Sequence, residues 1–358
     1  MKVLYAIQGT GNGHLSRARD IIPVIEEYAR LDILISGTQA EVELGHPVKY
    51  RKKGLGFVFG KNGGIDILST YRNANISSLM KEINTLPVKN YDLVINDFEP
   101  VSAWACRRKN VPCISLSHQA SLLSKQVPRP SKKDPAATFL LENYAPTDFQ
   151  ISFHFAPYDE HIFTPVIRKQ VRDTETDDKG HYTVYLPAFD DKKLIKKLSF
   201  FDDIRWEIFS KHTRSTYQKG NITVRTVSNG AFLKSMAEST GVLCGAGFET
   251  PAETLFLGKK LMVIPMKSQY EQQCNAAALK QMGVPVIKNL KEKNLPKIGD
   301  WLSDGKPIPV FYPDQTRTIV KQIFEGHIAR ILKDNEHENN LLIREYYRTN
   351  IPEYETTD

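Results

Sequence analysis

The chain of 358 residues is long enough to bury the cores of two domains, and its 41% hydrophobic and 25% charged residues are typical of a water-soluble protein. No apolar run approaches the ~20 residues that span a bilayer, and the N-terminus enters a predicted strand without a signal-peptide cleavage region. The four cysteines form no C-x-x-C pair, so we expect a reduced, cytoplasmic protein without a metal site.

The net charge of +7 is concentrated in residues 46–133, which hold fifteen Lys and Arg against five Asp and Glu. A basic stretch of this kind suits an anionic partner. No nucleic-acid motif accompanies it, so we expect no nucleic acid, and the remaining interpretations are a solvated basic face or an anionic membrane. The basic run 51–53 adjoins the apolar segment 54–60, which favours reversible docking at the inner face of the membrane.

Helical and strand patterns alternate along the chain, which predicts an α/β protein with parallel sheets. In the first half we expect strands at 2–7, 32–36, 92–96, 112–117 and 149–153, with helices at 14–30, 75–85 and 99–109. The pattern restarts in the second half, where we expect strands at 181–189, 204–210, 221–227, 240–245 and 260–265. Two Rossmann-like domains follow from this repetition.

The segment 173–179 is polar and charged, which suits a linker between domains. We therefore expect a first domain at 1–165, a linker at 166–180, a second domain at 181–335, and a C-terminal helix and tail at 336–358.

The first predicted strand runs into the sequence GTGNGHLSRARD, in which Gly11 and Gly13 precede a helix that opens near His14. The G-x-G-x-G spacing is not the G-x-G-x-x-G of NAD-binding folds, and the Gly-Lys-Ser/Thr of ATP-binding loops is missing. At a helix N-terminus the helix dipole disfavours imidazolium, which leaves the ring able to accept a proton. His14 is therefore a candidate general base, although a polar residue that merely starts a helix would look the same.

Two carboxylates follow the predicted strand 92–96, at the carboxyl edge of the sheet. Asp97 could orient His14 and stabilise its protonated form, and Glu99 is a competing candidate for this role. Asp97 is equally well placed to cap the N-terminus of the predicted helix 99–109. The sequence leaves these alternatives open.

The run GAGFETPAETLFLGKKLMVIPMKSQYEQQ, residues 245–273, predicts a glycine turn, a helix, a buried strand and a second helix. Backbone N–H groups of Gly245, Ala246 and Gly247 can approach a diphosphate, and the helix that follows aims its positive end at the same place. The spacing of Thr250 and Glu253 is that of a capping box.

The strand of this run ends before Glu271 and Gln272, which it brings to the carboxyl edge of the sheet. Ligands of open α/β sheets bind at that edge. An acidic residue in the first turn of a helix is the simpler explanation for Glu271, because the helix dipole favours it there.

The same run resembles the donor-binding half of the GT-B UDP-glycosyltransferases. It is similar to the plant and macrolide enzymes and to the N-acetylglucosaminyltransferase that forms lipid II. Their pattern of Gly, Ser/Thr, Glu, a proline-terminated strand and Asp/Gln-Gln-x-x-Asn is matched by Gly247, Thr250, Glu253, 258–265 and 271–275. The resemblance implies the GT-B fold, in which two Rossmann-like domains face a central cleft and the C-terminal helix crosses back to the first domain.

The resemblance also implies roles in donor binding. Glu253 would hold both ribose hydroxyls of UDP, since its two oxygens can accept from a cis-diol, and Glu271 and Gln272 would bind the donor sugar. In the loop 228–237, Phe232 and Leu233 would bind uracil, with the backbone of Leu233 making the polar contacts. Taken alone, Phe232 would pass for an ordinary core aromatic.

On the acceptor side, the resemblance makes His14 the base that deprotonates the acceptor hydroxyl, with Gly11 and Gly13 beside it. His118 and Gln119 occupy a loop that faces acceptor and donor sugar in the lipid II enzyme, where His118 replaces a glutamate.

The pattern of the plant enzymes is broken at two positions of the glycine turn. Gly245 stands where they have His, and Glu249 where they have Asn. Side-chain contacts to the phosphates must therefore come from elsewhere, with Thr250, or Ser210 and Lys211, as candidates, and the loop 187–189 as a further one.

The resemblance implies an inverting glycosyltransferase that uses a UDP-sugar, needs no cofactor or metal, and acts on an acceptor that is unknown, with a lipid-linked acceptor of cell-envelope glycan synthesis among the candidates. Backbone groups and a helix dipole would stabilise the leaving diphosphate in place of a cation. A UDP-sugar hydrolase of the same fold is an alternative, because residues 11–17 fit its G-x-G-H-x-x-R loop. A non-catalytic nucleotide-sugar-binding protein is another, whereas the DSGG-x-x-E-E stretch of the 2-epimerases is not matched.

Overall fold

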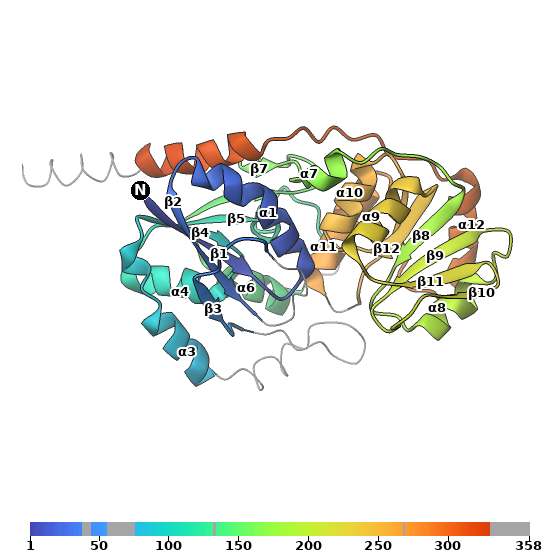
Figure 1. Cartoon of the computed structure of the whole chain (residues 1–358), viewed down its shortest axis with the longest axis horizontal. Coiled ribbons are helices and arrows are strands. Elements are labelled where there is room, and N and C mark those ends of the chain that lie inside the picture. The colour runs from blue at the N-terminus through green and yellow to red at the C-terminus, as the bar shows by residue number, and fades with distance from the viewer. Residues whose placement is uncertain (38–43, 56–75, 132–133, 268, 330–358) are drawn as a thin grey trace, which may run out of the picture.

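The computed structural model describes residues 1–37, 44–55, 76–131, 134–267 and 269–329, and these form two α/β domains (Figure 1). Each domain is built on one sheet whose central strands are parallel. The predicted α/β class with two parallel sheets is therefore confirmed.

The first domain has a seven-stranded sheet in the order β3-β2-β1-β4-β5-β6-β7. Its strands are β1 (Lys2–Gln8), β2 (Arg30–Ser36), β3 (Tyr50–Lys52), β4 (Leu93–Asp97), β5 (Cys113–Ser117), β6 (Phe149–Phe153) and β7 (Ile162–Phe163). Its helical segments are α1 (Asn12–Glu26), α3 (Ile76–Thr85), η1 (Val88–Asn90), α4 (Pro100–Lys109), α5 (His118–Ser121) and α6 (Pro135–Tyr144). The central strands are buried on both faces, so they are continuous apolar runs, as parallel strands require.

The second domain has a six-stranded sheet in the order β10-β11-β9-β8-β12-β13, in which β10 alone runs antiparallel to its described neighbour. Its strands are β8 (His181–Tyr185), β9 (Arg205–Ser210), β10 (Tyr217–Lys219), β11 (Ile222–Thr226), β12 (Gly241–Gly245) and β13 (Lys260–Ile264). Its helical segments are α8 (Asp191–Leu198), α9 (Asn229–Glu238), α10 (Glu249–Phe256), α11 (Tyr270–Gln281), η2 (Glu292–Asn294) and α12 (Leu295–Asp304). The short helix α7 (Lys169–Arg172) lies between the domains.

The segment 228–237, which we expected to be a loop, is helical instead and forms most of α9. Residues that suit a helix, such as Ala, Leu, Lys and Met, fill this segment after Ser228, and its buried side chains pack onto the sheet. The start of α9, rather than its middle, is therefore where backbone groups are free of the helix ladder.

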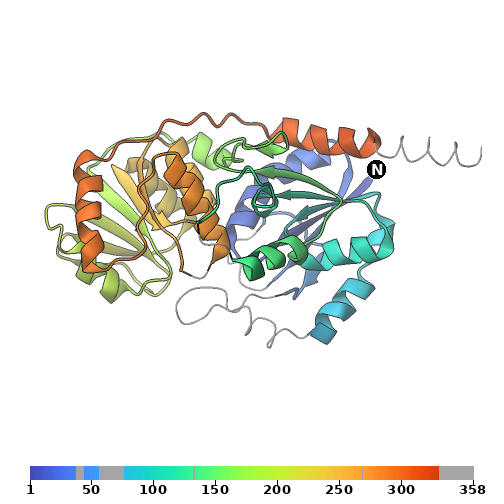
Figure 2. The same ribbon diagram turned by 180° about the vertical axis from the view of Figure 1, so that it is seen from behind.

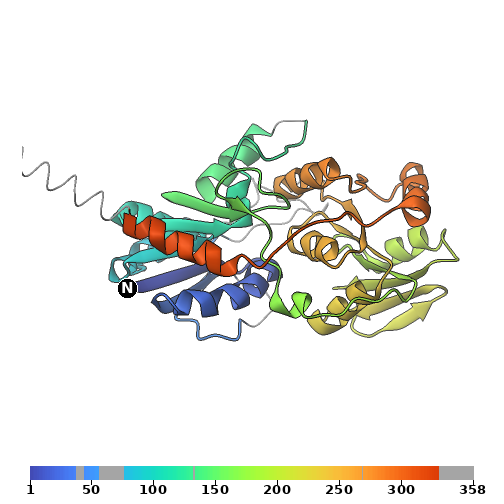
Figure 3. The same ribbon diagram turned by 90° about the horizontal axis from the view of Figure 1, so that it is seen from above.

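A helix at residues 316–329 crosses back to the first domain, where it lies along α1 (Figure 3). Tyr28 stacks on Phe324 with the ring centroids 5.0 Å apart, and Arg317 forms an ion pair with Glu27. We had assigned these residues to the second domain, and this was wrong, because the apolar face of the helix is buried against the first domain. The segment 336–358, where we expected the crossing helix, lies outside the described residues.

Candidate functional site

A cavity of about 1020 Å³ lies between the two domains and takes its lining from both. The first domain contributes the loop before α1, the start of α5 and one side of α6, and the second contributes the N-terminal ends of α9, α10 and α11. Among the predicted site residues, the following line the cavity: Gly11, Gly13, His14, His118, Gln119, Phe232, Gly247, Thr250, Glu253, Glu271 and Gln272.

His14 and Asp97 meet at the carboxyl edge of the first sheet. Strands β1 and β4 are parallel neighbours, with Ile7 opposite Asp97, so the loop after β1 lies over the end of β4. His14 Nδ1 is 2.9 Å from Asp97 Oδ1. A carboxylate oxygen can only accept, so Nδ1 carries a proton, and in the neutral ring the lone pair is then on Nε2.

The Asp97 carboxylate is completely buried, and it does not cap a helix. Glu99 caps α4 instead, accepting from the backbone N–H groups of Val101 at 2.7 Å and Ser102 at 2.6 Å. The capping role that we considered for Asp97 was therefore wrong, and so was the competing role of Glu99 beside His14. Burial alone would raise the pKa of Asp97, but the Arg17 guanidinium and His14 hold this pKa below its usual value.

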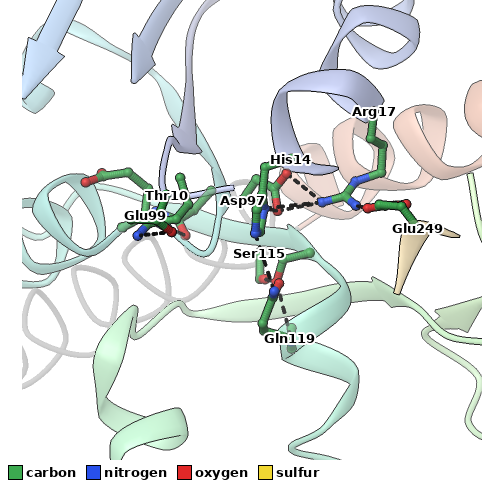
Figure 4. Close-up of polar contacts among 12 residues, drawn as sticks. Thr10, His14, Arg17, Asp97, Glu99, Ser115, Gln119 and Glu249 are labelled. Carbon is green, nitrogen blue, oxygen red and sulfur yellow. Dashed lines mark hydrogen bonds and ion pairs between the residues drawn. The ribbon is translucent and has the colours of Figure 1, made fainter. Parts of the chain in front are cut away.

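Arg17 joins this pair to the second domain (Figure 4). Its side chain is 2% exposed and lies over the Phe153 ring, and its Nη2 donates to Asp97 at 2.8 and 3.0 Å. Its Nη1 donates to Glu249, the first residue of α10. Burial raises the pKa of Glu249 to about 7 against the opposing effect of Arg17. One buried cation thus binds carboxylates from both sides of the cleft.

His118 and Gln119 differ in their freedom to meet a substrate. His118 is buried, its Nδ1 is 3.0 Å from the Phe153 carbonyl oxygen, its Nε2 is 2.8 Å from Asn275 Oδ1, and its ring stacks on Phe248. Because both nitrogens are engaged, the expected acceptor role of His118 is replaced by a contact that holds the two domains together. Burial lowers the pKa of His118.

Gln119 lies between His14 of the first domain and Glu271 of the second. Its Nε2 lies 3.4 Å from His14 Nε2 (Figure 4). The same nitrogen is 3.3 Å from Glu271 Oε2 of the second domain, so Gln119 spans the cleft. Its Oε1 is buried without a partner among the described residues. A buried amide oxygen that lacks a donor suits a ligand hydroxyl.

The glycine turn after β12 meets the cleft through its later residues. Gly247 and Thr250 line the cavity, whereas Gly245 and Ala246 do not. Ala246 is buried and its carbonyl accepts from Asn275 Nδ2 at 3.2 Å. Gly245 and Ala246 therefore do not face the cavity as expected, and the backbone N–H groups that do begin at the N-terminal end of α10.

The predicted capping box of Thr250 and Glu253 does not form. Helix α10 begins at Glu249, one residue before Thr250, and its N-cap has no side-chain hydrogen bond. Glu253 is instead held by Arg168, whose Nε and Nη2 donate to the two carboxylate oxygens at 2.5 and 2.7 Å. Arg168 comes from the segment between the domains and lines the same cavity.

Of the two residues expected to bind uracil, Phe232 and Leu233, only Phe232 lines the cavity. Phe232 is partly exposed and lines the cavity, where it packs against Tyr185 and Phe209. Leu233 is buried in the core and faces away from the cavity, and its position inside α9 leaves no free backbone N–H. The expected role of Leu233 was therefore wrong. Ser228 lies at the N-cap of α9 and in the cavity wall, where the first N–H groups of the helix have no partner within it.

Glu271 and Gln272 both lie in the first turn of α11 and face the cavity. Gln272 Oε1 accepts from the Met266 N–H at 3.0 Å, which fixes the loop after β13. Glu271 faces Gln119 across the cleft. The side chains expected to bind a donor sugar therefore lie opposite His14.

The family model described as "Glycosyl transferase family 1" matches residues 1–305. The chain belongs to glycosyl transferase family 1.

Solved structures of this glycosyltransferase's neighbours share its fold at low identity. MurG of Acinetobacter baumannii is 13% identical with a TM-score of 0.54, covering 90% of this chain and 98% of its own. Arabidopsis thaliana UGT89C1, complexed with UDP-L-rhamnose, is 14% identical with a TM-score of 0.56, covering 92% and 94%. The spinosyn forosaminyltransferase SpnP is 12% identical with a TM-score of 0.55, covering 90% and 95%.

These neighbours confirm that the glycosyltransferase has the GT-B fold. No curated protein matches its sequence.

Two ion pairs of the glycosyltransferase site, Arg17 with Glu249 and Arg168 with Glu253, were not predicted from the sequence. Arg17 is the final residue of the G-x-G-H-x-x-R motif, and this motif could have identified it as a site residue. Arg168 lay in the expected linker, and Glu249 was noticed solely as a departure from the plant pattern. Their ion pairs join segments far apart in the sequence, and no local pattern encodes such pairs.

Proposed function

We propose that this glycosyltransferase is an inverting enzyme that moves a sugar from a UDP-sugar to an acceptor hydroxyl without a metal ion. The observation that carries the proposal is the His14–Asp97 pair: His14 lines the cleft, and its Nδ1 is 2.9 Å from the buried Asp97 Oδ1. Asp97 accepts a hydrogen bond from the Nδ1–H group, which leaves the lone pair of Nε2 facing the cavity and the Gln119 side chain. A positioned imidazole of this kind is a general base for a hydroxyl.

The two domains divide the reaction between them. The acceptor oxygen gives its proton to His14 Nε2 and attacks the anomeric carbon, and the bond from that carbon to the UDP oxygen breaks. The leaving diphosphate would then lie at the N-terminal end of α10, which belongs to the second domain, whereas His14 belongs to the first. Attack from the side opposite the leaving group inverts the anomeric centre. Helix N–H groups and nearby cations such as Arg168 and Lys211 would stabilise the departing charge.

Uridine nucleotides are supported by two observations. Neighbours of the same fold were solved with UDP-L-rhamnose and with UDP-2fluoro-glucose. In this chain, the Glu253 carboxylate lines the cleft and can accept from a ribose diol once Arg168 gives up at least one of its two contacts. Arg168 would then be free to meet the diphosphate.

Replacing Glu253 by alanine is expected to weaken UDP binding by about 1–3 kcal/mol, because buried ribose hydroxyls would be left unpaired. Calorimetry without added metal measures the effect, with 2′-deoxy-UDP as the second ligand. The wild type should prefer UDP to 2′-deoxy-UDP, and Glu253→Ala should lose most of that preference. The exposed Glu292 of the same domain gives the control Glu292→Gln, which should bind both nucleotides as the wild type does.

Two calorimetric results would contradict the donor assignment. One is the absence of UDP binding by the wild type, and the other is a preference for ADP over UDP. A uniform loss for both nucleotides in Glu253→Ala would mean that the residue acts through Arg168 rather than through the ribose.

A UDP-sugar hydrolase is the second candidate, and Arg17 favours it. This residue completes a G-x-G-H-x-x-R loop and lies buried beside His14. In a hydrolase His14 would deprotonate water instead of an acceptor. UDP release from UDP-sugars, measured with and without acceptors, separates transfer from hydrolysis. UDP binding without release from any UDP-sugar would indicate a non-catalytic nucleotide-sugar-binding protein.

We also propose that the protein docks on anionic membranes at their cytoplasmic face and uses a lipid-linked acceptor. Within the described ranges, no helix combines the length and apolar content needed to cross a bilayer. Helices α3, α4 and α6 lie along one side of the first domain (Figure 2). Here Ile76 is 54% exposed and Met80 is 37% exposed, beside the exposed cations Lys81, Arg107 and Arg108. We call these five residues the α3–α4 surface; the apolar part of the segment 54–60 lies largely outside the described residues.

Sedimentation with vesicles tests this docking. Binding to anionic vesicles should exceed binding to neutral ones and should fall as salt rises, since the charges are exposed. Each basic residue near an anionic surface contributes about 1 kcal/mol, so Arg107→Glu combined with Arg108→Glu should weaken binding by at least about tenfold. The same charge change at Lys192 and Lys196 of α8 is the control. Equal binding of the wild type and the Arg107→Glu, Arg108→Glu variant to anionic vesicles would refute docking through the α3–α4 surface. It would not bear on the proposed sugar transfer.

A further inference from the structure

The position of Arg17 is set by two carboxylates that pull in different directions. Its Nη2 donates to both oxygens of Asp97, and its Nη1 donates to Glu249 across the cleft. Its Nε has no partner among the described residues. The guanidinium is therefore held at its Nη ends, one by each domain.

Arg17 competes with His14 for the same oxygen. Asp97 Oδ1 lies 2.9 Å from His14 Nδ1 and 3.0 Å from Arg17 Nη2, and Arg17 Nη2 is 3.4 Å from His14 Nδ1 (Figure 4). A guanidinium nitrogen can only donate. If Arg17 moved wholly onto Asp97, its N–H groups would take Oδ1 and face Nδ1. The ring would then favour the proton on Nε2, and a protonated Nε2 cannot accept the proton of a hydroxyl.

Glu249 reaches Arg17 through a gap that a glycine leaves open. A Cβ atom on Gly13 would lie 2.8 Å from Glu249 Cγ, which is too close for a real contact. Gly13 does not need the conformational freedom of glycine, because it sits in the first turn of α1 with an ordinary helical backbone. What its position requires is the space, and Glu249 fills it from the second domain.

We propose that Glu249 is a positioning residue that fixes the proton of His14 on Nδ1. By holding Arg17 Nη1, Glu249 keeps the guanidinium from displacing His14 on Asp97. Because Glu249 belongs to the second domain and the other three residues to the first, the base is set for catalysis when the domains close as they do here. This inference rests on the proposed role of His14, but its central claim, the tautomer, can be measured without any reaction.

Replacing Glu249 by alanine is expected to lower kcat by about ten- to a hundredfold, less than the roughly 10⁴-fold loss that a wholly wrong tautomer causes in a serine protease triad. The Kd for UDP should stay the same or fall, because a negative charge beside the diphosphate turn is removed. Glu249→Gln keeps an oxygen that accepts from Arg17, so it should regain most of the lost turnover. Glu292→Gln, the same charge change on the surface, should leave kcat unchanged.

Gly13→Ala tests the same contact without touching the carboxylate. The added methyl group would push the Glu249 side chain away from Arg17, and alanine favours the helical conformation over glycine by about 1 kcal/mol. This gain offsets part of the cost of moving Glu249 away from Arg17, so the variant should fold while showing the lowered kcat. It keeps the proposal testable if Glu249→Ala does not fold.

Nitrogen NMR of the His14 ring in the nucleotide-free protein gives the deciding signal. The wild type should carry its proton on Nδ1, and Glu249→Ala and Gly13→Ala should shift it toward Nε2. An unchanged Nδ1 proton in both variants overturns the proposal, whatever happens to turnover. So does a loss of UDP affinity in Glu249→Ala as large as the loss of kcat, since Glu249 would then be a donor-binding residue. If the tautomer shifts but no acceptor is ever glycosylated, the failure lies with the proposed function.

Discussion

Replacing His14 by alanine is expected to lower turnover by about 10²–10⁴-fold while the Kd for UDP stays within about threefold of the wild type. The imidazole faces the cleft from the first domain, whereas the residues proposed to bind UDP lie on the second, so the loss should fall on kcat. Turnover of a working UDP-sugar and calorimetry with UDP measure the two quantities.

A second histidine of the first domain provides the control for this experiment. His161 lies outside the cavity lining, and its ring contacts Glu160 and Phe149, so His161→Ala should keep full turnover. A wild-type turnover in His14→Ala would show that His14 is not the general base. His118 could not replace it without giving up a hydrogen bond, because both of its nitrogens are engaged.

Replacing Asp97 by asparagine should damage both turnover and stability. The amide can donate to His14 Nδ1, which would move the ring proton to Nε2 and lower kcat by up to about 10⁴-fold, as loss of the aspartate does in a serine protease triad. Removing one partner of a buried ion pair typically costs about 3–5 kcal/mol. Because Glu249 still holds Arg17, we expect a value at the lower end of that range, measured by chemical denaturation.

Comparing the stability of the wild type with that of Asp97→Asn at different pH values should show the charge of the Asp97 carboxylate. The pKa of Asp97 is lower in the folded protein than its usual value, so folding favours the charged form. The stabilisation is present above the unfolded pKa of about 4 and is lost as the pH falls through the folded pKa. The difference in stability between the wild type and Asp97→Asn should therefore shrink as the pH falls below about 5.

The surface pair of Asp173 and Lys169 gives the contrast for this measurement. Asp173 is 59% exposed, so Asp173→Asn should change stability by less than about 1 kcal/mol. A similar small effect of Asp97→Asn, or a difference that grows as the pH falls, would show that Asp97 is not a buried anion.

The strands that could be predicted from the sequence are those buried on both faces. The run KVLYAIQ has almost no polar residue and became β1, and the run KLMVI became β13 in the same way. The strands that were missed are short and lie toward the sheet edges. In β10, the sequence YQK has all three residues exposed, and it pairs with β11 through its backbone, which leaves no mark on residue type.

In the candidate site, too, some contacts could be predicted from the sequence and others could not. The contact of His14 with Asp97 could be predicted, because parallel strands bring their carboxyl ends to one edge and both residues follow such strands. The pairs of Arg17 with Glu249 and of Arg168 with Glu253 could not, since each depends on how segments from different parts of the fold come together. The prediction for Leu233 was wrong for a different reason. The segment 228–237 was expected to be a loop, but it is helical and forms most of α9.

The return of residues 316–329 to α1 means that the first domain is assembled from two segments that are far apart in the sequence. Synthesis by the ribosome proceeds from the N-terminus, so the second sheet, which is contiguous from β8 to β13, can close before the helix at residues 316–329 exists. The surface of α1 that Phe324 and its neighbours cover stays open until those residues have been made. The order in which this protein is made is thus not the order in which its domains are finished.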